Sequence, residues 1–253
     1  MPDNKDDNTV LQLVNVSKSF GPVNVIKDVT LSVRRGEVQA LLGENGAGKS
    51  TLIKMIAGVH EPDSGKILID GSEVTITSTK DSEAHGIATI HQELNLVPTL
   101  SVAENIMLGR TPKRFGLVNY KHLNAQAQAA LNLIGLDVPL KQPVGELGIA
   151  KQQLIEIAKA LSMNARILIL DEPTAALTGK EVDALFAIIE ELKAKGVAMV
   201  FISHHLDELL LCNTQLTYGL FERDIQTNEV ECCLRLRIEV FVIDQTKALR
   251  GAA

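Results

Sequence analysis

Gly43-Glu44-Asn45-Gly46-Ala47-Gly48-Lys49-Ser50-Thr51 is the stretch that decides the fold of this chain. It matches G-x-x-x-x-G-K-[ST], the pattern of a phosphate-binding P-loop. The glycines let the backbone approach phosphate closely, and its N–H groups, with the N-terminus of a following helix, face the negative charge. A short apolar run, Val38–Leu42, precedes the loop, and a helical pattern follows over Lys49–Ala57. The sequence therefore predicts a buried strand, a nucleotide-binding loop and a helix.

Within this loop, two side chains have predicted chemical roles. Lys49 supplies a cation for the β- and γ-phosphates of ATP, and Ser50 supplies a hydroxyl for Mg²⁺. A chance glycine-rich turn is the alternative, which the flanking strand and helix disfavour. The residues that we expect to contact ATP here are Gly43, Asn45, Gly46, Gly48, Lys49, Ser50 and Thr51.

A second acidic motif follows a run of four apolar residues, Ile167–Leu170. Such a run is typical of a strand buried on both faces. It carries Asp171 to the carboxyl end of the sheet, where open α/β sheets bind ligands. We expect Asp171 to hold the metal through water and Glu172 to orient or deprotonate the attacking water. The alternative is an acidic strand end next to a helix cap.

The pattern of apolar residues alternates between strand-like and helical along the chain. From Val102 to Leu161 helical patterns dominate, and Leu147, Ala150, Leu154, Ile157 and Leu161 predict one apolar helical face. A later amphipathic helix is marked by Val182, Phe186, Ile189 and Leu192. This order predicts an α/β domain with a mainly parallel sheet and a helical subdomain. The other predicted strands are Val10–Val16, Ile26–Val33, Lys66–Ile69, Ile87–Ile90 and Ala198–Ile202.

Length and composition limit the class of protein further. The 253 residues are 45% hydrophobic, which suits one large domain or one with an inserted subdomain. The longest apolar runs have about six residues, whereas a membrane-spanning helix needs about 20. Residues 1–8 are polar and acidic, unlike a signal peptide, and we expect them to be disordered. These features favour a cytoplasmic location.

Charge and cysteine content exclude two further classes. The chain has 25 basic and 31 acidic residues, well mixed, for a net charge of −6. It has no basic block of the kind that nucleic acids attract, so we expect no nucleic-acid partner. Cys212, Cys232 and Cys233 lack zinc-site spacing and are interpreted as reduced thiols.

The order of these motifs resembles the nucleotide-binding subunit of ABC transporters over about residues 9–211. The resemblance implies an ABC ATPase cassette over residues 9–220, with an N-terminal antiparallel β subdomain and a helical subdomain at about 95–161. It implies a Phe20 ring stacked on adenine and a Gln92 side chain that contacts Mg²⁺ and links to the membrane subunits. It also implies a His204 side chain that contacts the γ-phosphate and acts in catalysis with Glu172 and Lys49.

Each of these three matches also has an ordinary structural interpretation. Phe20 could be a core or surface aromatic residue, and Gln92 could be a loop amide. His204 could be a histidine at a strand end that makes a structural hydrogen bond.

Four local stretches resemble the N-terminal half of monosaccharide-importer ATPases. That resemblance implies ATP-driven uptake of a small sugar or related solute at the inner face of a cell membrane. The implied partners are a second ABC cassette, from the same or a homologous chain, transmembrane permease subunits and, indirectly, a periplasmic or extracellular sugar-binding protein. The four stretches are Gly43–Thr51, His91–Leu96, Ala103–Arg110 and Asp171–Thr178.

Two motifs of the family are altered in this chain. The signature Leu-Ser-Gly-Gly-Gln is replaced by Leu147-Gly148-Ile149-Ala150-Lys151. In the family this motif serves the ATP held by the opposing cassette, so the change should weaken the partner's composite site rather than this chain's own loop. Thr178 replaces the aspartate of the D-loop.

The C-terminal part departs most from the family. Residues 221–253 do not align with it, and no second cassette follows. One hypothesis is a frameshifted or rearranged reading of a longer gene; the alternative is a genuine short variant. Without the family's usual strands, we expect an exposed sheet edge.

Three other functions compete with the transport motor. A P-loop GTPase needs Asn-Lys-x-Asp after the loop, and the only match, Asn4–Asp7, precedes it; a kinase would usually lack the adjacent acidic pair and the later histidine. A soluble ABC ATPase of translation or DNA repair usually has basic linkers or long coiled-coil inserts. A truncated cassette that binds ATP without productive transport remains open.

Overall fold

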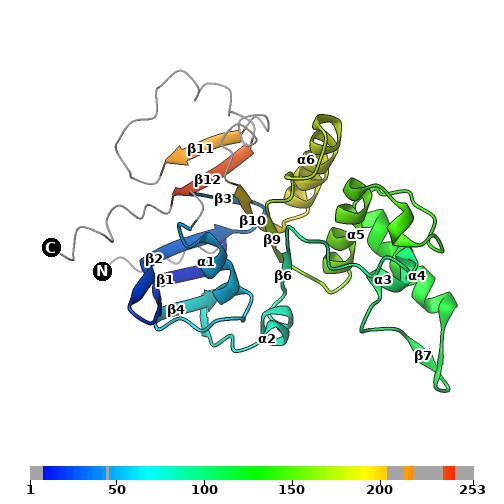
Figure 1. Ribbon diagram of the computed structural model, residues 1–253, viewed down its shortest axis with the longest axis horizontal. Helices are drawn as coiled ribbons and strands as arrows, with labels where there is room; N and C mark the ends of the chain where they lie inside the picture. The colour runs from blue at the N-terminus through cyan, green and yellow to red at the C-terminus, as the bar shows by residue number, and fades with distance from the viewer. Residues whose placement is uncertain (1–7, 44–45, 204–213, 219–235, 243–253) are drawn as a thin grey trace.

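A six-stranded parallel sheet forms the centre of the computed structural model, which describes residues 8–43, 46–203, 214–218 and 236–242 (Figure 1). The strand order is β11-β12-β3-β10-β9-β6, and every pairing in this sheet is parallel. The predicted parallel-sheet α/β architecture is therefore confirmed. The strands are β3 (Val38–Leu42), β6 (Ile87–Ile90), β9 (Ile167–Asp171), β10 (Ala198–Ser203), β11 (Thr214–Tyr218) and β12 (Leu236–Val242).

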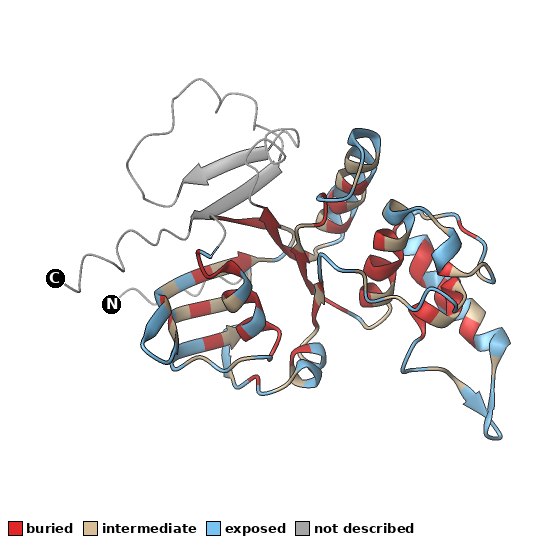
Figure 2. Ribbon diagram, in the orientation of Figure 1, coloured by how far each residue is buried: buried red, intermediate tan, exposed pale blue. Residues whose placement is uncertain are grey.

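Strands β3, β10 and β9 are buried on both faces, which explains their nearly continuous apolar sequences (Figure 2). Successive side chains alternate between two hydrophobic clusters, as the pleat of a strand requires. Leu168, Leu170 and Phe201 point to the cluster shared with the helical region, while Ile169 and Val200 belong to the opposite cluster.

An antiparallel sheet covers the hydrophobic cluster that contains Ile169 and Val200. Its order is β2-β1-β4-β5, and it encloses helix α1 against the central sheet. This is the N-terminal antiparallel β subdomain that the family resemblance implies. Its elements are β1 (Thr9–Phe20), β2 (Val23–Arg34), β4 (Ser64–Ile69), β5 (Ser72–Val74) and α1 (Lys49–Ile56).

The helical region lies on the other side of the central sheet (Figure 1). Its first helix begins with a capping box in which the Ser101 hydroxyl accepts from the Glu104 N–H and the Glu104 carboxylate accepts from the Ser101 N–H. Its main elements are α3 (Val102–Ile106), β7 (Lys113–Arg114), β8 (Leu117–Val118), α4 (Tyr120–Leu133), the 3₁₀ turn Val144–Glu146 and α5 (Ile149–Leu161).

The buried face of α5 contains three of the five predicted residues, Leu154, Ile157 and Leu161. The helix begins at Ile149, so Leu147 precedes it, and Ala150 is only half-buried. Gln153 and Glu156 are also buried among the apolar residues, each 6% exposed. Packing of α5 between the sheet and the other helices therefore encloses polar side chains in addition to those that the apolar periodicity predicts.

Two further helices complete the described fold. Helix α2 (Thr79–Ala84) leads into β6, and helix α6 (Gly179–Ala194) packs beside β10. Helix α6 buries Leu185, Ile189 and Leu192, and its half-buried Phe186 ring stacks on Phe201 at 5.6 Å. None of the helices in the described parts of the chain has the length and apolar composition that a membrane crossing requires.

We expected an exposed sheet edge in the absence of the family's usual C-terminal strands, but β3 is not an edge strand. Strand β12 pairs with β3 in parallel, with Val240 opposite Ala40. Residues 221–253 therefore contain a strand that continues the sheet.

Candidate nucleotide site

The P-loop connects the buried strand β3 to helix α1, as predicted. Gly46 and Gly48 both have positive φ, at 86° and 94°, which glycine adopts readily. A Cβ atom at Gly48 would lie 3.0 Å from the carbonyl oxygen of Val25, on strand β2. Position 48 therefore requires glycine for both its backbone conformation and its close contact with the antiparallel sheet.

Lys49 is the first residue of α1 and is 6% exposed. Its ammonium group donates a hydrogen bond to the carbonyl oxygen of Gly43, across the base of the loop. The cation is thus held inside the loop, next to backbone N–H groups at the start of a helix, where an anion is favoured.

The acidic pair lies at the carboxyl end of β9 and faces the P-loop. Asp171 pairs with Ile202 of β10, and the Glu172 N–H donates to the Ile202 carbonyl at 3.1 Å. Glu172 has φ of 48°, an uncommon value for a residue with a side chain. Loop and acidic pair enclose a cavity of about 160 Å³, lined by Val25, Gly46, Ala47, Gly48, Lys49, Ser50, Thr51, Asp171, Glu172 and Ile202.

The surroundings of Asp171 favour a cation. Burial raises the pKa of the Asp171 carboxyl above its ordinary value of 3.8, and the charge of Glu172 raises it further. The positive charges of His91, Lys49 and Lys54 oppose this rise in the pKa. Two adjacent carboxylates in a partly dry cavity form a site where a divalent cation would relieve both burial and repulsion.

The residues present fit Mg²⁺. Magnesium is usually bound by one or two carboxylates together with waters and substrate phosphates, rather than by a full cage of protein ligands. Asp171 and the Ser50 hydroxyl line one cavity. In the described part of the chain, no group of three or more His, Cys, Asp or Glu side chains could hold a metal ion. Waters and phosphate oxygens would supply the remaining ligands of a metal held here.

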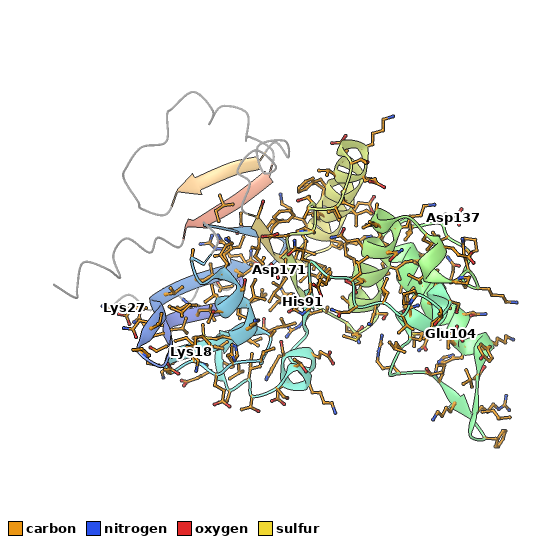
Figure 3. The ribbon with its side chains drawn as sticks, in the orientation of Figure 1. Lys18, Lys27, His91, Glu104, Asp137 and Asp171 are labelled. Atoms are coloured by element: carbon orange, nitrogen blue, oxygen red, sulfur yellow. The ribbon has the colours of Figure 1, made fainter. Side chains whose placement is uncertain are left out.

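His91 also lies near Asp171, and no role was predicted for it from the sequence. It follows β6, which pairs with β9 in parallel, with Ile90 opposite Leu170. The next residues on the two strands are therefore His91 and Asp171, which Figure 3 labels at the centre of the molecule. The adjacency of the two strand ends, which only the sheet order fixes, is the signal that could have identified it.

Three predicted site residues of the described chain, Gly43, Phe20 and Gln92, lie outside the lining of this cavity. The Phe20 ring, at the end of β1, is 44% exposed and meets the His60 ring edge-on at 5.2 Å. Gln92 follows His91 and is exposed. Asn45 and His204, which were also predicted to contact ATP, fall outside the described residues.

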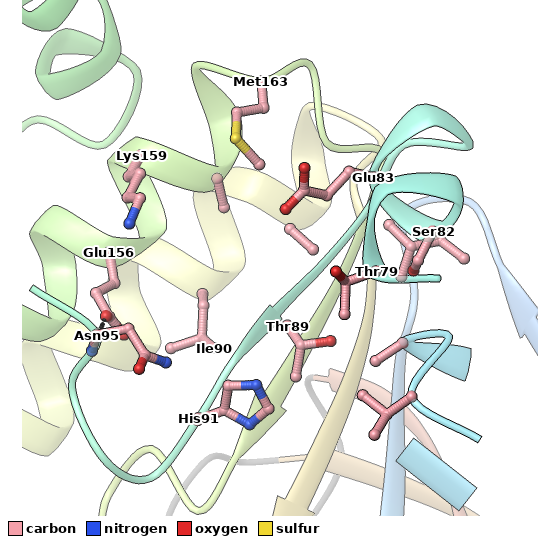
Figure 4. A pocket seen from close by; sticks show the side chains of 15 residues that line it. Thr79, Ser82, Glu83, Thr89, Ile90, His91, Asn95, Glu156, Lys159 and Met163 are labelled. Atoms are coloured by element: carbon pink, nitrogen blue, oxygen red, sulfur yellow. Dashed lines mark hydrogen bonds between the residues drawn. The ribbon is translucent and has the colours of Figure 1, made fainter. Parts of the chain in front are cut away.

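A second cavity, of about 220 Å³, lies between α2, β6 and α5 (Figure 4). Glu156 extends from α5 into its lining and accepts a hydrogen bond from the Asn95 N–H at 2.5 Å. Burial raises the pKa of the Glu156 carboxyl, while the Asn95 hydrogen bond and the charge of Lys159 oppose the rise. This contact ties the segment after Gln92 to the helical region.

The P-loop and the acidic pair, brought together by a parallel sheet, define an ATP-binding cassette. The family model described as "ABC transporter" matches residues 26–175, which is more than half of the chain. The chain belongs to the ABC transporter family.

Two relatives with named functions show which members of the family this chain resembles in sequence. The chain is 71% identical over 204 residues to the "Ribose import ATP-binding protein RbsA" of Corynebacterium glutamicum, which covers 81% of this chain and 39% of that protein. It is 53% identical over 208 residues to "Ribose import ATP-binding protein RbsA 1" of Streptomyces avermitilis, covering 82% and 40%. The chain thus spans about two fifths of the length of these relatives.

Solved structures support the same fold. An ATP-binding cassette of an ABC transporter in its ADP conformation superposes with a TM-score of 0.71 at 28% identity, covering 81% of this chain and 84% of that one. A dimeric ATP-binding cassette in a post-hydrolysis state, bound to ADP and Pi, gives a TM-score of 0.65 at 26% identity, covering 79% and 90%.

Proposed function

We propose that this chain binds MgATP in the cavity between the P-loop and the acidic pair and hydrolyses it. The observation that carries the proposal is the cavity of about 160 Å³, in which Lys49, Ser50, Asp171 and Glu172 meet. Phosphoryl transfer needs positioning and charge neutralisation more than covalent chemistry by the protein. This cavity supplies a cation, a hydroxyl and two carboxylates at one place.

Each residue has a separate role in this proposal. Lys49 and the loop N–H groups hold the phosphates, and Ser50 and Asp171 hold the metal, Asp171 through water. Glu172 orients the attacking water and takes its proton. Bound Mg²⁺ would neutralise charge on the phosphate oxygens.

Six further residues complete the proposed site, and their roles rest on the family pattern. Gly43 and Thr51 contact the phosphates with the rest of the loop. Phe20 stacks on adenine, and Gln92 contacts the metal. His204 contacts the γ-phosphate, and Asn45 belongs to the phosphate-binding loop; these two positions lie outside the described residues.

The transported substrate in this proposal is ribose or a related monosaccharide. The 71% identity to a ribose import ATP-binding protein supports this class. The chain would act at the inner face of a cell membrane, with permease subunits, a second cassette and, indirectly, a sugar-binding protein outside the cell.

The altered signature motif implies that the two ATP sites of such a pair are unequal. Gly148 is the N-cap of α5 and provides no side-chain hydrogen bond there, and Ile149, 49% exposed, stands where the family has glycine. This surface offers no serine hydroxyl to a partner's ATP. We therefore expect the site completed by this surface to be the weaker one, while this chain's own P-loop depends on the signature of its partner.

Two substitutions test the hydrolysis proposal directly. Glu172→Gln should keep MgATP binding and lower turnover by about 10²–10³-fold, because the amide cannot take the proton. Lys49→Ala should lose both, because it removes the cation from the loop. Calorimetry with MgATP and phosphate release in the presence of a complete partner cassette measure the two effects.

The outcomes separate failure of folding from failure of the proposed roles. Circular dichroism of both variants checks that they fold. Turnover by Glu172→Gln equal to that of the unmodified chain would reject its role as base. MgATP binding unchanged in Lys49→Ala would place the nucleotide elsewhere.

A further inference from the structure

A short hairpin, β7–β8, protrudes from the helical region between α3 and α4 (Figure 1). Lys113 pairs with Val118 and Arg114 with Leu117, so Phe115 and Gly116 form a two-residue turn. Both turn residues have positive φ, at 52° and 80°. Such a turn normally has asparagine or aspartate followed by glycine, because bulky side chains are strained in this conformation. Local turn chemistry therefore does not explain a phenylalanine at position 115.

Core packing does not explain it either. The Phe115 side chain is 93% exposed, and the neighbouring apolar residues Leu117 and Tyr120 are 76% and 57% exposed. Figure 2 shows the hairpin as exposed along its length. The Arg114 guanidinium lies 5.4 Å from the Phe115 ring centroid, so cation and ring share the tip. Large apolar side chains gathered on an exposed projection mark a contact surface.

The segment that carries this hairpin has basic but no acidic residues. No Asp or Glu occurs between Glu104 and Asp137, although the whole chain has a net charge of −6. Figure 3 labels these two bounding acids. Lys113, Arg114 and Lys121 are exposed within this interval.

A fourth cation in the interval has a structural role. The Arg110 guanidinium donates to the carbonyl oxygen of Ser162 at 2.9 Å and to that of Ile106 at 3.0 Å. It ties the end of α3 to the end of α5, so the free charge of the surface comes from the hairpin and the start of α4.

We propose that the hairpin tip docks on an anionic lipid surface. Phe115 and Leu117 would enter the boundary between headgroups and acyl chains, while Lys113 and Arg114 contact lipid phosphates. The combination of an aliphatic side chain, an aromatic ring and cations without acids fits a lipid interface better than a nucleic acid, on which Leu117 could not stack. The inference deepens the proposed function, since a transport ATPase works beside a bilayer, and it rests on that function for its biological setting.

The position of the hairpin is compatible with simultaneous nucleotide binding. It lies at the end of the helical region remote from the antiparallel sheet (Figure 1). None of its residues lines the cavity between the P-loop and the acidic pair. Lipid contact and MgATP binding can therefore be measured independently.

Vesicle co-sedimentation tests the proposal with the full chain. The probe is large vesicles of phosphatidylglycerol and phosphatidylcholine, compared with phosphatidylcholine alone. Phe115→Ser with Leu117→Ser should lower partition to the anionic vesicles roughly tenfold, because it removes the buried apolar area. Lys113→Glu or Arg114→Glu should each lower it by at least about fivefold, because a cation near an anionic surface contributes about that factor. Partition should also fall as salt is raised.

Matched variants control for exposure and net charge. Leu133→Ser replaces a leucine that is 43% exposed in the same helical region, and Lys27→Glu reverses an exposed cation on β2. Both should partition as the unmodified chain does. Calorimetry should find MgATP binding unchanged in the hairpin variants, whereas Lys49→Ala should lose MgATP binding and keep lipid binding.

Two results would overturn the proposal. If the chain partitions no more strongly to anionic than to zwitterionic vesicles, the hairpin contacts a protein rather than a lipid surface. Equal partition of the hairpin variants and the controls would place any lipid contact elsewhere. Neither result depends on whether the chain hydrolyses ATP, so failure of this inference is distinguishable from failure of the proposed function.

Discussion

Asp171 and Glu156 are both acidic side chains whose pKa is raised by burial, but their surroundings are opposite in kind. Asp171 stands next to a second carboxylate, Glu172, in the cavity that the P-loop lines. Glu156 lies in the other cavity, where a backbone N–H from Asn95 donates to it at 2.5 Å. The Asp171 carboxyl is repelled by Glu172, and a bound cation could relieve this repulsion. The Glu156 carboxylate already accepts a hydrogen bond from Asn95 within the fold.

This difference indicates separate roles for similar chemistry. A carboxylate buried next to another carboxylate is costly unless a cation or a proton joins it, and such groups are typical of functional sites. A carboxylate that accepts a backbone N–H from a distant segment fixes the position of that segment. We therefore interpret Asp171 as a ligand-binding residue and Glu156 as a positioning residue for the segment after Gln92.

The largest effect should follow from changing the cavity carboxyl. Asp171→Asn removes a charge that would hold the metal through water, so the Mg²⁺ concentration for half-maximal MgATP binding should rise about 10- to 100-fold. The folded chain without nucleotide should be no less stable, because the amide also removes the repulsion with Glu172. Calorimetric titrations of ATP at several Mg²⁺ concentrations measure the first effect, and urea unfolding measures the second.

Glu156→Gln is the matched control for this change, since it neutralises the other buried carboxyl. It should leave the Mg²⁺ dependence unchanged. Equal Mg²⁺ dependence in Asp171→Asn and the unmodified chain would remove the distinction between the two acids.

The sequence was enough to predict the P-loop and the acidic pair, because both depend on local order. The loop is one contiguous motif with a strand before it and a helix after it, and parallel strands carry their following residues to one edge of the sheet. The Glu156–Asn95 contact was not predictable in this way. Its partners are 61 residues apart, and the apolar periodicity of α5 does not mark the polar Glu156 as buried.

The same limit explains why His91 and Phe115 were not singled out. The proximity of His91 to Asp171 follows from the pairing of β6 with β9, which the sequence does not specify. The exposure of Phe115 follows from a turn with two positive φ angles, whereas its residue type is more often buried. In both positions, neighbours in space rather than neighbours in sequence decide the role.

A smaller effect is expected at Glu156, where two substitutions distinguish the contribution of its hydrogen bond from that of its charge. Glu156→Ala removes the acceptor of the Asn95 N–H and should lower the free energy of unfolding by about 1–3 kcal/mol. Glu156→Gln keeps an acceptor oxygen and should restore most of this stability. Urea unfolding gives the energies, and hydrogen exchange gives the protection of the Asn95 amide, which should fall in the alanine variant and recover in the glutamine variant. Equal Asn95 protection in all three chains would show that Glu156 does not hold this segment.

The smallest effect concerns pH and follows from the direction of the pKa shifts. Burial raises the folded-state pKa of Asp171 and Glu156 above their ordinary values of 3.8 and 4.5, so the folded chain retains these protons more strongly than the unfolded chain. This contribution to stability is present below those ordinary values and is lost as the pH rises through the raised pKa values. Asp171→Asn with Glu156→Gln should therefore gain stability relative to the unmodified chain as the pH increases from about 4 towards neutrality.

Glu104 offers a control of opposite sign in the same molecule. The Ser101 hydroxyl and the Ser101 N–H donate to its carboxylate and lower its pKa below the ordinary value of 4.5. Its contribution to stability is present above that value and is lost as the pH falls through the lowered pKa. Glu104→Gln should therefore lose stability relative to the unmodified chain as the pH increases from the lowered pKa to the ordinary value of 4.5, and the difference should then stay constant at higher pH. Urea unfolding of the three chains between about pH 2 and pH 8 measures both slopes. Slopes of the same sign would mean that burial does not dominate the titration of Asp171 and Glu156, and the contrast between those two acids would then rest on their contacts alone.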